Sequence, residues 1–283
     1  MKKLLVLIDF SKGSEKAFDF ACHYAMGATL EVDVMHSFKV PILDSNMSPE
    51  MLQEERKAIE KREYARIGEF VQNYGASKKS EDLANLNFDL IVQEGNIVEL
   101  VEQTTLSREF ELLVMGHKGL TEDSEALMGS KAFNTIRKAN CPVLIIPDKA
   151  QYKIPEHILY ALDLDDFSSA DLDKLKQIQE NSGAKVTMLH VNTGGHYMDA
   201  TKMDGYRNAL DATMDFENLK VEILEEDDIV TGLEEYANDN GVDLLAVQSK
   251  RYDAIPDNFL KGLTSAMIKG GQRPLLVFHA DSE

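Results

Sequence analysis

The chain repeats itself, and this duplication limits its fold more than any other feature of the sequence. Segments 4–9 and 32–36 recur at 158–163 and 186–190, and segments 111–114 and 142–145 recur at 243–246 and 274–277. Self-similarity of this kind marks a repeated structural unit. We therefore expect two tandem domains, 1–150 and 151–283. The offset in residue number falls from 154 to 132 along the repeat, which indicates an insertion of 22 in the first copy, between its second strand and Gly95.

Each copy alternates short apolar runs with helical periods. In the first copy, strands are expected at 4–8, 32–35, 86–92, 112–115 and 143–146, and helices include 14–26, 54–74 and 131–140. The first helix has Ser11 or Ser14 as N-cap and gathers one apolar face from Ala17, Phe18, Ala21, Cys22 and Ala25. This alternation predicts the α/β class, with a doubly wound parallel sheet in each domain. Ligands of such sheets bind at the carboxyl ends of the strands, at the switch point.

Composition excludes several classes of function. A net charge of −19 over 283 residues would repel nucleic acids and acidic membrane surfaces. The two cysteines, Cys22 and Cys141, fall in apolar segments and are expected to be reduced core residues. The apolar run after Lys3 is interrupted by the charge at Asp9, too early for a signal sequence, and no run reaches the length of a membrane span. A cytoplasmic protein is expected.

A glycine pattern follows the fourth strand of the first copy. Gly116 and Gly119 come directly after it, and Gly129-Ser130 follow after nine intervening residues. Backbone N–H groups without Cβ atoms in the way can surround phosphate oxygens. The spacing matches neither a P-loop nor a GxGxxG dinucleotide turn. The alternative is an ordinary flexible turn.

Asp9 stands at the carboxyl end of the first strand, where the fourth strand should deliver Gly116. Its carboxylate suits hydrogen bonding to the adenine or ribose of a nucleotide. It also suits the N-cap of the helix that begins between Ser11 and Ser14. Both roles remain open for the one side chain.

These residues resemble those of the universal stress protein family in its tandem form. The resemblance rests on Leu7 to Ser11, His36, Gly95 and above all the Gly116, Gly119, Gly129-Ser130 pattern, which is that family's ATP-binding pattern. It implies two Rossmann-like domains of the adenine nucleotide alpha-hydrolase type, related by a pseudo-two-fold axis. Their last strands, 143–146 and 275–278, would meet across that axis within one chain. The cofactor implied is ATP, ADP or AMP.

The resemblance also assigns contacts to individual residues. Ile8 and Asp9 should meet the adenine or ribose, and Ser37 the base. Met115 and Gly116 should line the ribose and phosphate side, and the phosphates should be held by Lys118, Gly119, Gly129, Ser130 and Lys131. The sequence departs from the family at Leu7-Ile8, where a proline is common. Lys118 and Lys131 are either phosphate ligands or ordinary surface lysines.

The second copy has lost the glycine pattern. Gln248, Arg251, Lys261 and Gly262 stand where the first copy has Gly116, Gly119, Gly129 and Ser130. The side chains of Gln248, Arg251 and Lys261 would intrude on a phosphate, so we expect a degenerate site. The acids at 163, 165, 166, 227 and 228 suit a cation or polar ligand, or a solvated acidic rim.

The leading hypothesis is a nucleotide-dependent regulator of the stress response with one nucleotide site, in the first domain. Ligand binding would order the loop between Gly116 and Ser130 and shift the equilibrium between conformational states of the protein. The alternative from the enzyme class is a weak ATPase or an adenylyl or phosphoryl transferase, with Ser130 helping to bind Mg²⁺ and Asp9 acting as an acid. A scaffold without nucleotide is a third hypothesis. No catalytic or metal-ligating cluster is seen in the sequence, and further homodimerisation is left open.

Overall fold

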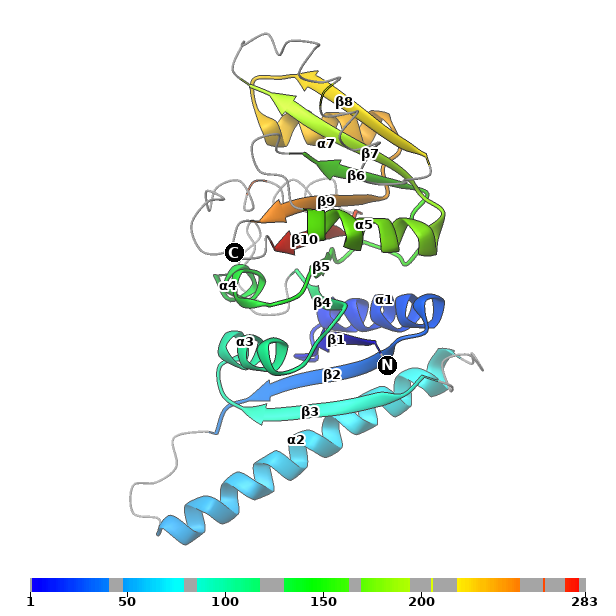
Figure 1. Cartoon of the computed structure of the whole chain (residues 1–283). Coiled ribbons are helices and arrows are strands. Elements are labelled where there is room, and N and C mark those ends of the chain that lie inside the picture. The colour runs from blue at the N-terminus through cyan, green and yellow to red at the C-terminus, as the bar shows by residue number, and fades with distance from the viewer. Residues whose placement is uncertain are drawn as a thin grey trace. The chain divides into compact units, whose positions relative to one another are not determined.

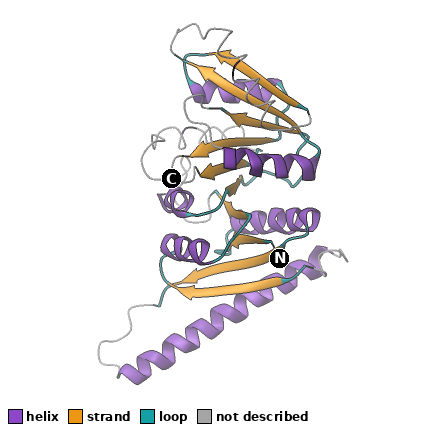
Figure 2. Cartoon of the chain, in the orientation of Figure 1, coloured by secondary structure: helices purple, strands orange, loops and turns teal. Residues whose placement is uncertain are grey.

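The chain divides into two compact units, 1–152 and 153–283. The computed structural model describes residues 2–40, 48–78, 86–117, 130–162, 169–193, 218–249 and 273–279, together with residues 205 and 262. No helix in these ranges combines the length and the apolar character needed to span a membrane. Each unit is an α/β domain whose strands are flanked by helices (Figure 2).

The first unit is a five-stranded parallel sheet with the order β3-β2-β1-β4-β5 (Figure 1). Its strands are β1 (Lys3–Leu7), β2 (Glu31–Phe38), β3 (Phe88–Glu94), β4 (Leu112–Gly116) and β5 (Val143–Ile146). Its helices are α1 (Lys12–Ala28), α2 (Pro49–Lys78), α3 (Ile97–Ser107) and α4 (Ser130–Lys138). The alternating order of strand and helix is the one that the sequence predicts.

The second unit repeats this sheet with the order β10-β9-β6-β7-β8, again parallel. Its strands are β6 (His157–Ala161), β7 (Lys185–Asn192), β8 (Leu219–Glu225), β9 (Leu244–Ser249) and β10 (Leu275–His279). Its described helices are α5 (Ser169–Ser182) and α7 (Ile229–Asp239). The doubly wound α/β class expected for both halves is confirmed.

Helix α1 shows how the local sequence builds these elements. Ser11 is the N-cap, and its side chain accepts a hydrogen bond from the Ser14 backbone N–H at 3.2 Å. The apolar residues expected on one face are all buried, and Phe20 joins them. Both cysteines are buried and outside any disulfide, as expected from the sequence. The helix thus covers the sheet through a stripe set by its own 3.6-residue period.

The register of the strands confirms the repeat and corrects one detail of it. Val32 pairs with Phe88, and its counterpart Val186 pairs with Leu219. The offset between the third strands is therefore 131 in residue number rather than 132, so the insertion before β3 is one residue longer than the sequence comparison gives. The helices that follow return to the offset of 132, because α3 and α7 begin at Ile97 and Ile229.

The turn after β8 is one residue longer than the turn after β3, and this restores the offset of 132 between the two units. In the first unit the turn uses Gly95, which has a φ of +149° that favours glycine. In the second unit Glu226 occupies the equivalent place, since its N–H bonds the last residue of β7 as that of Gly95 bonds the last residue of β2. One extra residue, Asp227, then precedes the N-cap Asp228. The longer turn explains why Glu226 could replace glycine at this position in the second unit.

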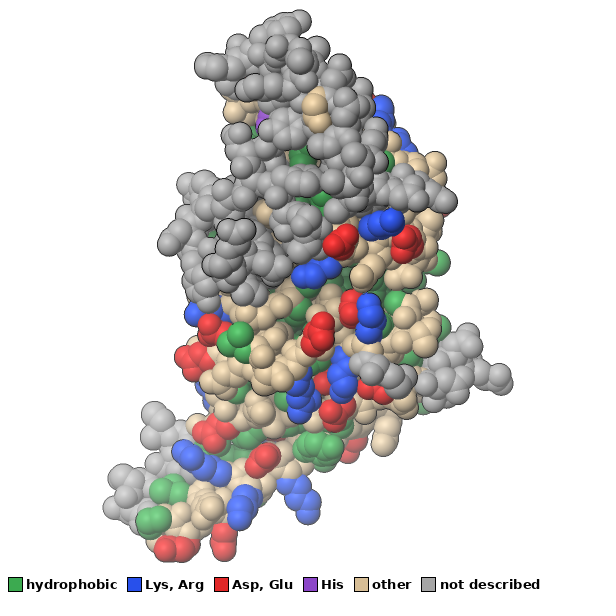
Figure 3. All heavy atoms as spheres, in the orientation of Figure 1, with side chains coloured by type: hydrophobic (Ala, Val, Ile, Leu, Met, Phe, Trp, Pro, Cys, Tyr) green, Lys and Arg blue, Asp and Glu red, His purple; other side chains and the backbone are tan. Residues whose placement is uncertain are grey.

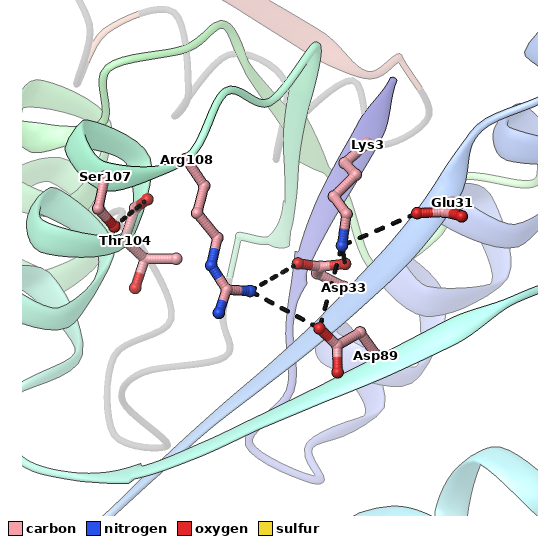
Figure 4. Close-up of polar contacts among 7 residues, drawn as sticks. All are labelled: Lys3, Glu31, Asp33, Asp89, Thr104, Ser107 and Arg108. Atoms are coloured by element: carbon pink, nitrogen blue, oxygen red, sulfur yellow. Dashed lines mark hydrogen bonds and ion pairs between the residues drawn. The ribbon is translucent and has the colours of Figure 1, made fainter. Parts of the chain in front are cut away.

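An ionic cluster around one buried carboxylate lies at the amino edge of the first sheet (Figure 4). Asp33 on β2 is fully buried and receives hydrogen bonds from Lys3 Nζ at 2.8 Å and Arg108 Nη1 at 3.3 Å. Asp89 lies 3.9 Å from Lys3 and 3.6 Å from Arg108. The hydrogen bond to Asp33 is the main cause that raises the pKa of Lys3. Two cations thus compensate a carboxylate removed from water.

The second unit replaces this cluster with neutral groups. By the offset that relates β1 and β2 to β6 and β7, His157 and Thr187 take the places of Lys3 and Asp33. His157 Nε2 lies 2.9 Å from Thr187 Oγ1, and Nδ1 lies 3.1 Å from the Asn240 carbonyl oxygen. Because a carbonyl only accepts, Nδ1 carries the proton and the hydroxyl donates to Nε2. Burial is the main cause that lowers the pKa of His157.

Candidate functional site

The candidate site lies at the carboxyl ends of β1, β2 and β4 in the first unit. The strand order reverses between β1 and β4, which makes this the switch point of the sheet. Continuing the register of β1 with β2 and β4 sets Asp9 beside Ser37, and Ile8 beside Gly116. Met115 is buried next to Gly116 on β4. The structure thus brings together five of the residues expected at the site: Ile8, Asp9, Ser37, Met115 and Gly116.

Asp9 is exposed and lies at the start of α1. Its Oδ1 accepts a hydrogen bond from the Ser11 backbone N–H at 3.0 Å. Ser11, not Asp9, caps the helix, so that alternative for Asp9 is wrong. The carboxylate keeps further acceptor positions, and the positive end of the helix dipole stabilises its charge.

Gly116 has a reason to be glycine that the sequence did not suggest. A Cβ on it would lie 2.5 Å from the backbone carbon and oxygen of Gly13, in the first turn of α1. Neither atom can rotate away, so β4 and α1 approach this closely only because Gly116 lacks a side chain. The end of β4 thus lies directly against the backbone of the first turn of α1. Gly13 was missed from the sequence, although a glycine in the first turn of a helix is a signal of close approach.

Phe10, next to Asp9, was also missed. It has a φ of +63°, which is strained for a side chain of this size. Its ring lies 4.8 Å from the His36 ring, and Arg66 Cζ on α2 lies 3.8 Å from its centroid. Glu63, also on α2, is buried with Oε2 at 3.7 Å from His36 Nε2. These contacts attach the β1–α1 turn to α2.

His36 holds the end of β1 from the neighbouring strand. Its Nδ1 donates to the Ile8 carbonyl oxygen at 2.7 Å. The second unit repeats the contact, with His190 Nδ1 donating to the Leu162 carbonyl oxygen at 3.0 Å. The shared hydrogen bond gives both histidines a structural role, because each ties the second strand of its sheet to the end of the first.

The phosphate side of the site is described only in part. Lys118, Gly119 and Gly129 lie outside the described residues, and for Ser130 and Lys131 the backbone alone is described. Ser130 is the first residue of α4, so the backbone N–H groups of that first turn point out of the helix N-terminus. His117, directly after Gly116, is buried with Nδ1 3.4 Å from Asp148 Oδ1. Within the described ranges, no group of three or more His, Cys, Asp or Glu side chains is placed to hold a metal ion.

The same place in the second unit carries a side chain. The register of β9 with β10 matches that of β4 with β5 at the offset of 132 found from the sequence, which makes Gln248 the counterpart of Gly116. The hydroxyl of Tyr160, on β6, donates to Gln248 Oε1 at 3.3 Å. The second unit therefore carries an amide side chain at a position where the first unit has none.

Comparison with known proteins decides the family. The model of the universal stress protein family matches residues 1–147. The chain belongs to this family. Universal stress protein YxiE of Bacillus subtilis (strain 168) is 25% identical over 150 residues, which cover 51% of this chain and 97% of that protein.

Solved structures extend the likeness to the whole chain. A universal stress protein from Archaeoglobus fulgidus DSM 4304 has a TM-score of 0.72 at 16% identity, and the match covers 99% of this chain and 98% of that one. A protein of unknown function from Pseudomonas aeruginosa PAO1, PA1789, has a TM-score of 0.63 at 12% identity, covering 99% and 93%. At these identities the likeness shows the fold. The fold of both units is thus the one found in these structures.

Proposed function

We propose that the first unit binds one adenine nucleotide at the carboxyl ends of β1 and β4, and that the chain acts as a nucleotide-dependent regulator in the stress response. The observation that carries the proposal is the exposed Asp9 carboxylate beside the bare backbone of Gly13 and Gly116. The family's ATP-binding pattern of glycines, read from the sequence, supports it. A cytoplasmic location belongs to the same proposal.

Charge sets the orientation of the nucleotide in this proposal. The Asp9 carboxylate would repel phosphate oxygens but accept hydrogen bonds from ribose hydroxyls or the adenine amino group. The base and ribose therefore lie over β1 and β2, near Ile8 and Ser37. The phosphates extend toward Ser130, where the N-terminus of α4 offers N–H donors and a positive dipole end. Lys118, Gly119, Gly129 and Lys131 complete the phosphate site.

The second unit is proposed to bind no nucleotide in this manner. Gln248 stands against the Tyr160 hydroxyl where the nucleotide would meet backbone in the first unit. The half that contains it also holds 25 acidic and 12 basic residues, against 24 and 18 in residues 1–150. Both differences disfavour a polyanion.

Isothermal titration with ATP, ADP and AMP tests the proposal on the full chain. Asp9→Ala should lower the affinity by about 10- to 100-fold, as expected for loss of a charged hydrogen bond. Asp9→Asn should lose less, because the amide oxygen still accepts from Ser11 and from the ligand. Gly129→Lys should abolish binding, and Asp163→Ala, the matched change in the second unit, should leave the affinity unchanged. Absence of binding to the wild-type chain, or equal loss from both alanine variants, would refute the proposal.

A further inference from the structure

Helix α2 is longer than its sheet requires. It spans 30 residues, Pro49–Lys78, within the segment that holds the insertion peculiar to the first unit. Its first turns project beyond the carboxyl ends of β2 and β3 (Figure 1). Over residues 49–58 only Leu52 is even partly covered. Covering the sheet therefore does not explain why this part of the helix exists.

The two faces of α2 differ in kind. The face toward the sheet carries Leu52, Ile59, Glu63 and Ile67, which are partly or fully buried. The opposite face has a stripe of Met51, Ala58 and Ala65 at intervals of seven residues, the interval that keeps side chains on one line. All three are exposed, Met51 by 53%. Such a stripe is small enough for another helix to approach closely.

Charged residues flank this stripe in an ordered way. Glu54 and Glu55 lie on its two sides between Met51 and Ala58, and Lys61 and Arg62 lie on its two sides between Ala58 and Ala65. Charged and apolar side chains are mixed over this helix on the visible surface (Figure 3). Within the described residues Glu54, Glu55 and Lys61 form no ion pair, and Arg62 pairs only with its neighbour Glu63. The flanks of the stripe are thus acidic between Met51 and Ala58 and basic between Ala58 and Ala65.

We propose that this face is a homodimer interface, in which the α2 helices of two chains pack antiparallel about a two-fold axis at Ala58. The axis sets Met51 against the partner's Ala65, and Ala58 against its own copy. In an antiparallel pair, equivalent flanks face each other. Glu54 then lies next to the partner's Lys61, and Glu55 next to the partner's Arg62, each twice by symmetry. The opposite register, with the helices parallel, would place acids against acids.

The charge pattern fixes the kind of partner and the strength of the contact. A face that is acidic in one half and basic in the other complements itself, so a second copy of this chain satisfies it without any further component. Two helices in contact over a few turns are a small interface beside the ~1,600 Å² typical of stable complexes. The dimer should therefore be reversible and should weaken as salt screens the ion pairs.

Sedimentation velocity over a concentration series at low salt tests this dimer. Glu54→Lys should raise the dissociation constant about tenfold or more, because two attractive contacts become repulsive. Lys61→Glu should do the same, and the double exchange should restore the wild-type value. Glu60→Lys makes the same charge change on the other side of the helix and should have no effect. A wild-type chain that stays monomeric, or a double variant no better than the single ones, overturns the proposal.

Cross-linking tests the register separately. The two native cysteines are buried, so an added cysteine is the exposed thiol. Ala58→Cys should form an intermolecular disulfide on oxidation, since the axis brings position 58 against itself. Gln53→Cys, exposed but on another side of the helix, should not. Equal cross-linking of the two variants, or none of Ala58→Cys, would contradict the antiparallel register.

Discussion

Gly116→Ala should destabilise the first unit whether or not a ligand is bound. The new Cβ would lie 2.5 Å from the Gly13 carbonyl carbon and oxygen, whereas ordinary contacts begin at 3.4 Å. Strand β4 and helix α1 would have to separate by the difference, about 0.9 Å. Overpacking of this kind costs about 1–3 kcal/mol. We expect the upper end of that range, because both atoms belong to the backbone and no rotamer change relieves the contact.

The assay is urea denaturation followed by far-ultraviolet circular dichroism, with the melting temperature as a second measure. Because the chain has two units, the comparison uses the transition that moves with the variant. For a unit of 152 residues, a loss of about 3 kcal/mol lowers the melting temperature by roughly 6–12 °C.

Gly27→Ala is the matched control, because a Cβ at that position meets nothing within 4 Å. It lies in the same helix, α1, and should stabilise the chain by about 0.5–1 kcal/mol. Equal stability of the two alanine variants would refute the close approach of β4 and α1.

Three further substitutions test the polar contacts. Lys3→Met should lower the free energy of unfolding by about 2–4 kcal/mol, since it leaves buried Asp33 with one cation. Lys2→Met, which breaks an exposed pair with Glu111, should lower it by less than about 1 kcal/mol. Equal losses in the two variants would contradict the account. Gln248→Ala should cost about 0.5–1.5 kcal/mol by removing one hydrogen bond of the buried Tyr160 hydroxyl, and an unchanged urea midpoint would argue against it. Because the pKa of His157 is lowered from 6.5, its contribution to stability is complete above pH 6.5 and is lost as pH falls through the lowered pKa. His157→Gln should therefore make the loss of stability with falling pH less steep. A steeper loss in the variant would show the sign to be wrong.

The architecture could be predicted because buried parallel strands leave short apolar runs in the sequence. Strand 143–146 was predicted at its observed bounds, and β1 and β4 within one residue. Helix α2 begins five residues before the predicted start at Glu54 and ends four after Tyr74. Among residues 49–53, 75 and 76 only Leu52 and Gly75 are even partly covered, so no apolar period marks these ends.

The candidate site could be predicted only as far as register reaches. The carboxyl ends of parallel strands meet at one edge, and this brings Asp9, Ser37 and Gly116 together without knowledge of side chains. The contact of Gly116 with Gly13 joins a strand to a helix far away in the sequence, and no local pattern records it. The positive φ of Phe10 is set by its packing against His36 and α2, which the sequence alone does not give.

The number of adenine nucleotides bound per chain tests the central claim most directly. Native mass spectrometry of the full chain, titrated with ATP and read together with the stoichiometry from calorimetry, counts the bound molecules. The account predicts one nucleotide per chain, lost in Gly129→Lys and kept when the second unit is changed at Asp163. A count of zero or two, or loss of binding through the second unit, would contradict it.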